Sequence, residues 1–135
     1  MRRNRKAAWV RELVAETELL PRNLVYPIFL VEGKNINEPI KTLPGVSRLS
    51  VDNAIKEIKL AKSLGIKMVS LFPVVSKEKK SLNAEEAYNK DNLVCKAVKE
   101  IKFAVPDIGV MVDVALDPYT THGHDGILVN NFVDN

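Results

Sequence analysis

The densest group of residues that could do chemistry lies between residues 113 and 126. It combines three carboxylates, two histidines and a tyrosine: Asp113, Asp117, Tyr119, His122, His124 and Asp125. Carboxylates suit hard cations such as Mg²⁺, and they also bind an ammonium group through charge-assisted hydrogen bonds. Asp113 and Asp117 stand four residues apart, where an apolar run passes into a loop. Both can therefore converge on one cation or one substrate amine.

The two histidines indicate a different chemistry. Because a single glycine separates His122 from His124, they could act as paired imidazole ligands, as in a metal-dependent hydrolase. A plainer interpretation has one histidine bonded to the backbone and the other facing solvent. Asp113 could likewise cap a turn, the Asp-Gly dipeptide at 125–126 is itself a favourable turn, and Tyr119 could simply pack. The residues alone leave these alternatives open.

An alternation of apolar runs and helical patterns positions this segment. The apolar runs predict buried strands near residues 24–31, 67–75 and 110–116. Apolar residues at helical spacing predict helices at residues 7–16, 51–64 and 91–103. This order is typical of parallel βαβ units with right-handed connections. The acidic segment then begins at the carboxyl end of the third strand, where α/β folds place their active sites.

Local signals refine these boundaries. Ser50 is predicted to cap the helix at 51–64, and Gly65 is predicted to end it. Residues 32–49 contain two glycines and two prolines and are predicted to form a connecting loop. Pro27 counts against the first strand, because proline removes a hydrogen-bond donor from the ladder.

Two architectures fit this order of elements: an open doubly wound sheet, and the opening part of a (β/α)₈ barrel. The segment after the first strand, Val31-Glu32-Gly33-Lys34, is not a dinucleotide-binding fingerprint. This weakens the open-sheet interpretation for a nucleotide-binding protein. Three strands cannot close a barrel, and a complete one takes about 250 residues. The barrel interpretation therefore predicts that the barrel is incomplete in this chain.

Composition narrows the partners and cofactors. Hydrophobic residues make up 46% and charged residues 27%, which is typical of a globular chain. Much of the net charge of +3 sits in the first six residues, and so few charges favour a solvated arm or a subunit contact over nucleic acid or a membrane. Cys95 is the only cysteine, which excludes a thiolate zinc site and an internal disulfide. Without an apolar stretch of about 18 residues or a secretory signal, a cytoplasmic protein is expected.

The acidic segment resembles the third-strand motif of the porphobilinogen synthase (5-aminolevulinate dehydratase) family. In zinc-dependent members, cysteines occupy the positions of Ala115, Asp117 and Asp125. This sequence has none of the three and resembles the aspartate-containing members, which often respond to magnesium. Further stretches resemble the family in the same order, at residues 24–29, 43–48, 71–74, 87–89 and 92–94.

The resemblance implies a fold and an activity. The fold would be α/β, with an N-terminal arm at residues 1–22 and the first three βα units of a TIM (β/α)₈ barrel at 23–135. The activity would be the condensation of two 5-aminolevulinate molecules to porphobilinogen with loss of two waters, in haem and other tetrapyrrole biosynthesis. Each substrate forms a Schiff base with a lysine, and in the family both lysines lie beyond the equivalent of Asn135. The chain alone is therefore expected to be inactive.

The resemblance also implies roles for single residues and a partner subunit. Asp113 and Asp117 would orient a substrate amine or a cation, and Tyr119 would bind substrate. Asp117 and Asp125 would hold a metal ion, with magnesium as the expected cofactor. The family assembles as homo-octamers through the arm, so the apolar side chains around Trp9 would bury against another subunit.

Two other functions remain open from the sequence. One is a metal-dependent hydrolase that uses Asp113, Asp117, His122 and His124. The other is an inactive fragment that associates with itself, because three barrel strands leave an open sheet edge and an uncovered apolar face.

Overall fold

A computed structural model describes residues 2–134 and shows the expected alternation of strands and helices. The strands are β1 (Val25–Leu30), β2 (Asn37–Pro39), β3 (Ser47–Leu49), β4 (Met68–Pro73), β5 (Gly109–Val112), β6 (Ile127–Val129) and β7 (Phe132–Asp134). The helices are α1 (Ala8–Leu13), α2 (Val51–Ser63) and α3 (Leu93–Ala104), with short 3₁₀ turns η1 (Arg2–Arg5), η2 (Pro21–Asn23), η3 (Lys77–Lys79) and η4 (Glu85–Tyr88). The predicted α/β class is confirmed.

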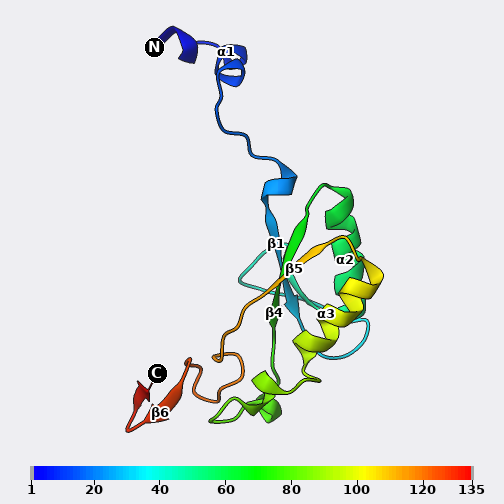
Figure 1. Cartoon of the computed structure of the whole chain (residues 1–135), viewed down its shortest axis with the longest axis vertical. Helices are drawn as coiled ribbons and strands as arrows, with labels where there is room; N and C mark the ends of the chain where they lie inside the picture. The colour runs from blue at the N-terminus through cyan, green and yellow to red at the C-terminus, as the bar shows by residue number, and fades with distance from the viewer. Residues whose placement is uncertain (1, 135) are drawn as a thin grey trace.

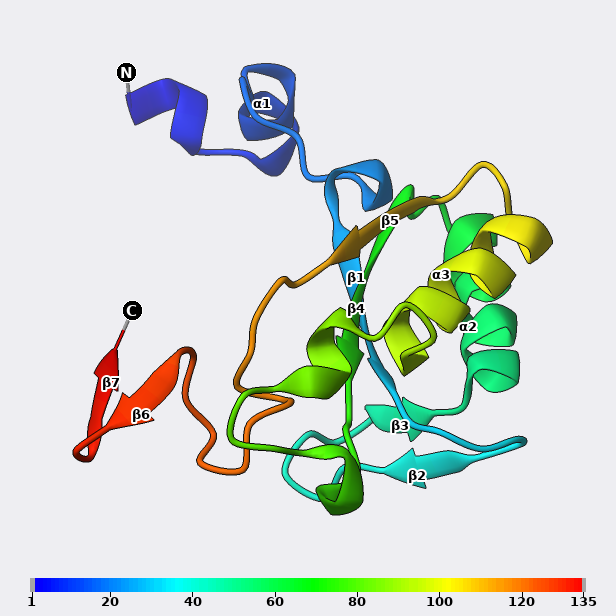
Figure 2. The same ribbon diagram turned by 60° about the horizontal axis from the view of Figure 1, so that its bottom comes forward.

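Five strands form one sheet in the order β2-β3-β1-β4-β5. Strands β1, β4 and β5 are parallel neighbours, β3 runs parallel to the end of β1, and β2 is antiparallel to β3. Figures 1 and 2 show α2 and α3 next to each other on one face of this sheet. Within residues 2–134 no α-helix covers the opposite face (Figure 1). That uncovered face is called the open face below.

The core lies between the sheet and the two helices. Alternate residues of β1 and β4 point toward the helices, because successive side chains of a strand face opposite sides. The buried residues of the core include Ile28, Leu30, Val69 and Leu71 from the strands, Ala54 and Ile58 from α2, and Ala97 and Ile101 from α3. The small alanines let both helices lie close to the sheet, so the large aliphatic side chains fill the space between them.

Helix α2 ends where the sequence predicts. Gly65 has a φ of +100°, a conformation that glycine adopts without a steric cost. Its N–H donates to Lys62 O at 3.0 Å, and the N–H of Ile66 donates to Ala61 O at 3.1 Å. These two bonds form a Schellman motif and satisfy carbonyls that the last turn would leave without a donor.

The start of α2 differs from the prediction. Ser50 stands at the N-cap position, but its side chain makes no capping hydrogen bond to α2. Instead its Oγ accepts a hydrogen bond from the N–H of Ile36 at 2.8 Å and fastens the preceding loop. Helix α3 does have a side-chain cap, because Asn92 Oδ1 accepts from the N–H of Cys95 at 2.8 Å.

The prediction that residues 32–49 form only a loop is wrong, because this segment contains β2 and β3. Strand β3 pairs with the last two residues of β1, in the register Phe29 to Arg48 and Leu30 to Leu49. Strand β2 then lies at the edge of the sheet and pairs with β3 only. Pro39 is tolerated there because an edge strand has no second neighbour that needs its backbone donors. Strands of three residues are too short to show a period of two in the sequence.

The third strand is also shorter than predicted, and a hairpin follows that the sequence did not indicate. Strand β5 ends at Val112 and does not reach residue 116, and Val114 is 94% exposed. Strands β6 and β7 pair antiparallel through a turn at Asn130 and Asn131, whose φ angles are 51° and 63°. Two successive positive φ angles are typical of a type I′ hairpin turn.

Pro27 is tolerated inside β1 because of the side that its nitrogen faces. The N–H of Val31 donates toward β3, to Leu49 O at 2.9 Å, so alternate residues of β1 direct their backbone groups to that side. Strand β3 pairs only with residues 29 and 30. The nitrogen of Pro27 therefore lies beyond the residues that pair with β3, and the proline interrupts no bond of that ladder.

The residues before β1 extend away from the sheet as an arm (Figure 1). Helix α1 covers six residues, fewer than the predicted helix at 7–16, and none of them is buried. None of the helices in the described chain is long and apolar enough to cross a membrane.

Candidate active site

A pocket of about 580 Å³ lies at the carboxyl ends of β1, β4 and β5. Its floor belongs to the open face of the sheet, because Phe29 and Phe72 alternate with residues that are buried under the helices. The two phenylalanines are neighbours in the register of β1 and β4. Their ring centroids lie 5.7 Å apart with the planes tilted by 34°. Aromatic rings at this separation make one apolar surface on which a small ligand can rest.

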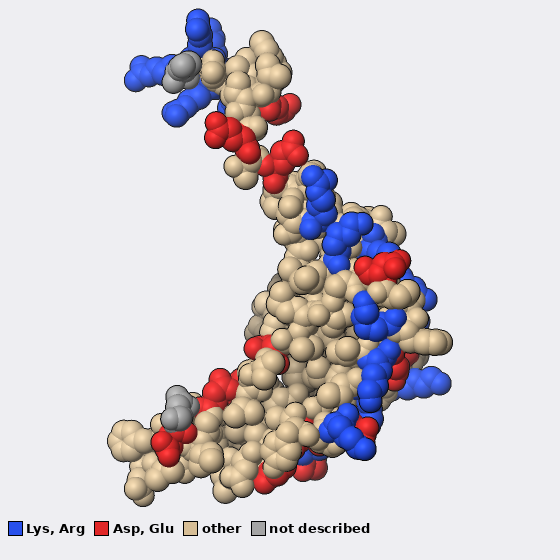
Figure 3. Space-filling model, viewed as in Figure 1, with Lys and Arg blue, Asp and Glu red and all other residues tan. Residues whose placement is uncertain are grey.

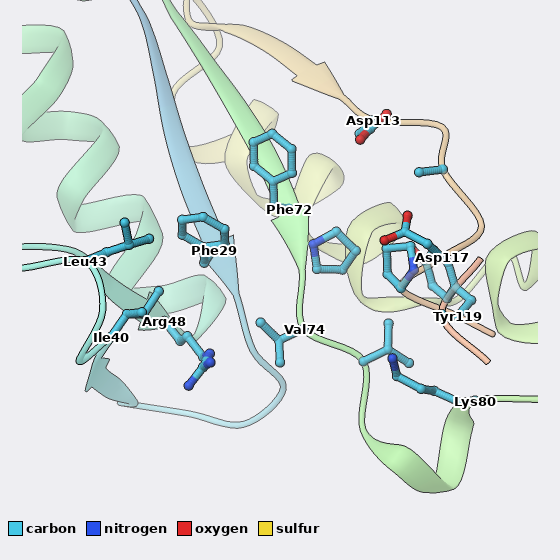
Figure 4. Close-up of a pocket in the computed structure, with 15 residues that line it drawn as sticks. Phe29, Ile40, Leu43, Arg48, Phe72, Val74, Lys80, Asp113, Asp117 and Tyr119 are labelled. Carbon is cyan, nitrogen blue, oxygen red and sulfur yellow. The ribbon is translucent and has the colours of Figure 1, made fainter. Parts of the chain in front are cut away.

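The wall beside β5 is acidic. Both Asp113 and Asp117 line the pocket, and both are exposed. Asp113 follows β5 directly, and Asp117 lies on the turn that comes next, at residues 116–119. Figure 4 shows Asp113 above Phe72 and Asp117 next to Tyr119. The structure therefore brings together the two carboxylates that the sequence analysis placed on one ligand.

Tyr119 also lines the pocket but is only 7% exposed. Burial raises the pKa of its phenol, and electrostatic repulsion from Cys95 and Glu86 raises this pKa further. The phenol is thus protonated at neutral pH and can donate a hydrogen bond. Its backbone is fixed as well, because the N–H of Ser81 donates to Tyr119 O at 3.1 Å.

Two cationic side chains in the pocket lining were not predicted as site residues. Arg48 comes from β3, and its Nη1 lies 3.0 Å from Glu38 Oε1 of β2. Lys80 follows η3, and Figure 4 shows it below Asp117 and Tyr119. The pocket thus holds both signs of charge, with carboxylates beside β5 and cations elsewhere. Arg48 was not predicted as a site residue because the sequence analysis assigned it to a loop, whereas it lies on β3.

Asp125 does not line this pocket. Its Oδ1 accepts hydrogen bonds from the N–H of Leu116 at 2.5 Å and from the N–H of Asp117 at 3.0 Å. The carboxylate therefore lies behind the turn that carries Asp117, where it binds the backbone. The sequence analysis kept a turn-capping role open for Asp113, and the structure shows such a role for Asp125 instead.

The two histidine rings stack on each other, and the ring of His122 also bonds to the backbone, whereas His124 is exposed. Their rings stack with centroids 5.8 Å apart and planes inclined by 20°, and His122 Nδ1 accepts from the N–H of His124 at 3.3 Å. Among residues 2–134, no group of three or more His, Cys, Asp or Glu side chains is placed to hold a metal ion. The four-residue metal site of a hydrolase, with Asp113, Asp117, His122 and His124, is therefore not assembled in the described chain.

Comparison with known proteins assigns the chain to a family. The family model of delta-aminolevulinic acid dehydratase matches residues 1–135. The chain belongs to the delta-aminolevulinic acid dehydratase family. A delta-aminolevulinic acid dehydratase from Bradyrhizobium diazoefficiens is 47% identical over 134 residues, which cover 99% of this chain and 38% of the relative. One from Selaginella martensii, named as chloroplastic, is 44% identical over 128 residues, or 94% of this chain and 30% of the relative.

A solved delta-aminolevulinic acid dehydratase also has this fold. The crystal structure from Toxoplasma gondii ME49, named also as porphobilinogen synthase, contains the reaction product porphobilinogen. It superposes with a TM-score of 0.94 at 45% identity, over 99% of this chain and 38% of that chain. This chain therefore spans about two fifths or less of the length of the dehydratases that it matches.

Proposed function

We propose that this chain is the amino-terminal part of a porphobilinogen synthase, which condenses two 5-aminolevulinate molecules with loss of two waters. The observation that carries the proposal is the pocket with Asp113 and Asp117 on one wall, in a chain matched by the family model along its whole length. The substrate bears an ammonium group, a ketone and a carboxylate. The pocket offers carboxylates for the first of these groups and an aromatic floor for the carbon chain.

The residues of this chain would bind and orient the substrate. Asp113 and Asp117 would accept hydrogen bonds from its ammonium group, and such charge-assisted bonds fix a direction as well as adding affinity. The protonated phenol of Tyr119 would donate a hydrogen bond to a substrate oxygen. The ketone must be activated as a Schiff base with a lysine. We assign that nucleophile to residues beyond 135, so this chain would supply the binding wall of the site.

The uncovered sheet supports the proposal that residues 23–135 are the opening part of a (β/α)₈ barrel. The open face carries half-exposed apolar side chains in neighbouring strands, with Val25 at 42%, Met68 at 36% and Met111 at 44%. In Figure 3 the lysines and arginines gather on the side of the helices, and few charged side chains mark the side between the arm and the hairpin. Within the described chain, residues 25–28 of β1 have a strand on one side only. Further strands could continue from both edges and cover this face.

The arm, residues 1–22, supports an oligomer. Trp9 is 68% exposed, Leu13 76% and Leu19 78%. Large apolar side chains at this exposure are typical of a surface that another chain covers. We propose that the arm packs on a second copy in a homo-octamer, that the protein works in the cytoplasm, and that it needs neither nucleic acid nor a membrane.

Magnesium remains a prediction. Asp117 faces the pocket, but residues 2–134 hold no group of three metal-binding side chains. An ion here would need ligands from outside the described chain, and no step of the reaction is assigned to it.

The test is to rebuild the enzyme from two parts. Residues 1–135 are co-expressed with the remaining part of the Bradyrhizobium diazoefficiens relative, and porphobilinogen formation is measured. Activity is expected in the mixture and not in either part, and Asp117→Asn is expected to lower kcat/KM about 10- to 100-fold, because a charged hydrogen bond is lost. Exposed Asp107→Asn is the matched control.

Trapping with borohydride tests whether the lysine that forms the Schiff base lies outside residues 1–135. After incubation with 5-aminolevulinate and borohydride, the 15.1 kDa mass of this chain is expected to stay unchanged. An adduct on Lys80 would show instead that the pocket of this chain holds its own nucleophile. A soluble two-part complex without any activity would contradict the proposed function.

A further inference from the structure

The turn that carries Asp117 begins with backbone donors that need an acceptor. After β5 the chain makes one turn, closed by hydrogen bonds to Leu116 O from the N–H groups of Tyr119 at 2.9 Å and of Thr120 at 3.1 Å. The first N–H groups of a helical turn have no acceptor inside that turn. Here these donors belong to Leu116 and Asp117. If they were left without an acceptor, they would weaken the turn that places Asp117 at the pocket.

Asp125 supplies the acceptor. Its Oδ1 lies 2.5 Å from the nitrogen of Leu116 and 3.0 Å from the nitrogen of Asp117, although it stands nine and eight residues away along the chain. Bonds to an ionised carboxylate are stronger than those between neutral groups. We propose that Asp125 is a positioning residue, whose carboxylate clamps this turn so that the side chain of Asp117 faces the pocket.

The segment that carries the clamp is itself anchored. Thr120 is 2% exposed, and its Oγ1 donates to His124 O at 3.0 Å and accepts from the N–H of Gly123 at 3.1 Å. The N–H of Thr121 donates to Ser81 O at 3.0 Å. These bonds hold the return of the chain in place without help from the carboxylate. Asp125 can therefore hold the turn in place, because the residues just before it are fixed by these other hydrogen bonds.

This role differs from metal or substrate binding in what it requires of the side chain. A metal ligand or a partner of an ammonium group needs the negative charge. A clamp needs an acceptor oxygen at one place, which asparagine also provides. The clamp itself is inferred from the two hydrogen bonds of Asp125. Its effect on substrate binding rests on the proposed function. The variants Asp125→Asn and Asp125→Ala therefore separate the two roles.

Amide hydrogen exchange in the 135-residue chain is the measurement, followed by NMR. Asp125→Ala is expected to speed exchange at Leu116 and Asp117 about tenfold, which corresponds to the loss of one hydrogen bond. Asp125→Asn is expected to keep both amides within a few-fold of the original chain. Asp113→Ala is the matched control, because it removes a carboxylate from the same segment. The amide of Leu71, a core residue, reports whether the whole fold has been lost.

Activity of the two-part enzyme gives a second readout. Asp125→Asn is expected to keep kcat/KM within a few-fold of the original complex, whereas Asp125→Ala and Asp117→Asn are both expected to lower it about 10- to 100-fold. Unchanged exchange at Leu116 and Asp117 in Asp125→Ala would overturn the clamp. An equal loss of activity in Asp125→Asn and Asp125→Ala, with the Leu71 amide still protected, would also overturn it. If Asp125→Ala unfolds the chain, Asp125→Asn alone decides. Exchange does not depend on turnover, so the clamp can hold even if the proposed function fails.

Discussion

Two regions of this chain are held together by different forces. The sheet and helices of residues 25–112 are held by apolar burial, with Leu30, Ile58 and Leu71 fully buried. Residues 113–126, which carry the two carboxylates and the tyrosine of the candidate site, bury few side chains and are held by side chains that bond to backbone groups. Apolar burial is non-directional and tolerates small shifts, whereas hydrogen bonds fix single atoms. The first region supplies the stability, and the second supplies the position of the carboxylates.

The largest effect is expected in the first region. Leu71 is fully buried between the sheet and the helices. Leu71→Ala removes its side-chain atoms and leaves a cavity, so the free energy of unfolding should fall by about 2–5 kcal/mol. Urea denaturation followed by circular dichroism measures this. Leu60→Ala on α2 is the control, because Leu60 is 53% exposed, and a change below about 0.5 kcal/mol is expected. Equal losses in the two variants would mean that burial does not distinguish them.

The same contrast decides what the sequence could predict. The bounds of helix α2 were predicted to within one residue. Its apolar residues recur at helical spacing, and Gly65 has the positive φ that ends the helix, so both signals in the sequence correspond to features of the structure. The parallel strands were predicted for the same reason. Strands β2 and β3 were missed, because three residues carry no readable period and their pairing depends on the end of β1.

The site was predictable in part. Asp113 and Asp117 could be placed at one pocket, because both follow a strand whose carboxyl end lies at the edge of a parallel sheet. Asp125 could not be placed, since its partners are backbone groups eight and nine residues away in a segment without periodicity. Arg48 was missed because its strand was missed. Contacts that depend on the path of a loop leave no pattern in residue types.

A smaller effect is expected in the second region. Thr120→Val keeps the shape of a buried side chain but removes the hydroxyl that bonds to Gly123 and His124. The net loss of a hydrogen bond is about 1 kcal/mol, and exchange of the Gly123 amide should quicken accordingly. Thr121→Val is the matched control, because Thr121 is exposed. A larger loss of global stability than in Leu71→Ala would break the division between the two regions.

The smallest effect concerns a single exposed carboxylate at the start of α2. Hydrogen bonds from the Ser50 side chain and then from the Asn35 backbone lower the pKa of Asp52 below its ordinary 3.8. The Asn35 N–H lies 3.1 Å from each carboxylate oxygen. A group whose pKa is lower in the folded state binds fewer protons there than in the unfolded chain. Its contribution to stability is therefore present above pH 3.8 and is lost as the pH falls through the folded pKa.

Asp52→Asn should remove this pH dependence. The original chain and the variant are compared by urea midpoints from about pH 6 down to about pH 2. The advantage of the original chain is expected to be constant near neutral pH and to shrink below pH 3.8. Asp107→Asn is the control, since Asp107 makes only an exposed ion pair with Lys62 at 3.1 Å, and such pairs add little stability. A stability difference between the original chain and Asp52→Asn that grew toward acid pH would mean that the pKa of Asp52 is raised, not lowered, by folding. Directional hydrogen bonds would then contribute to stability only in the second region.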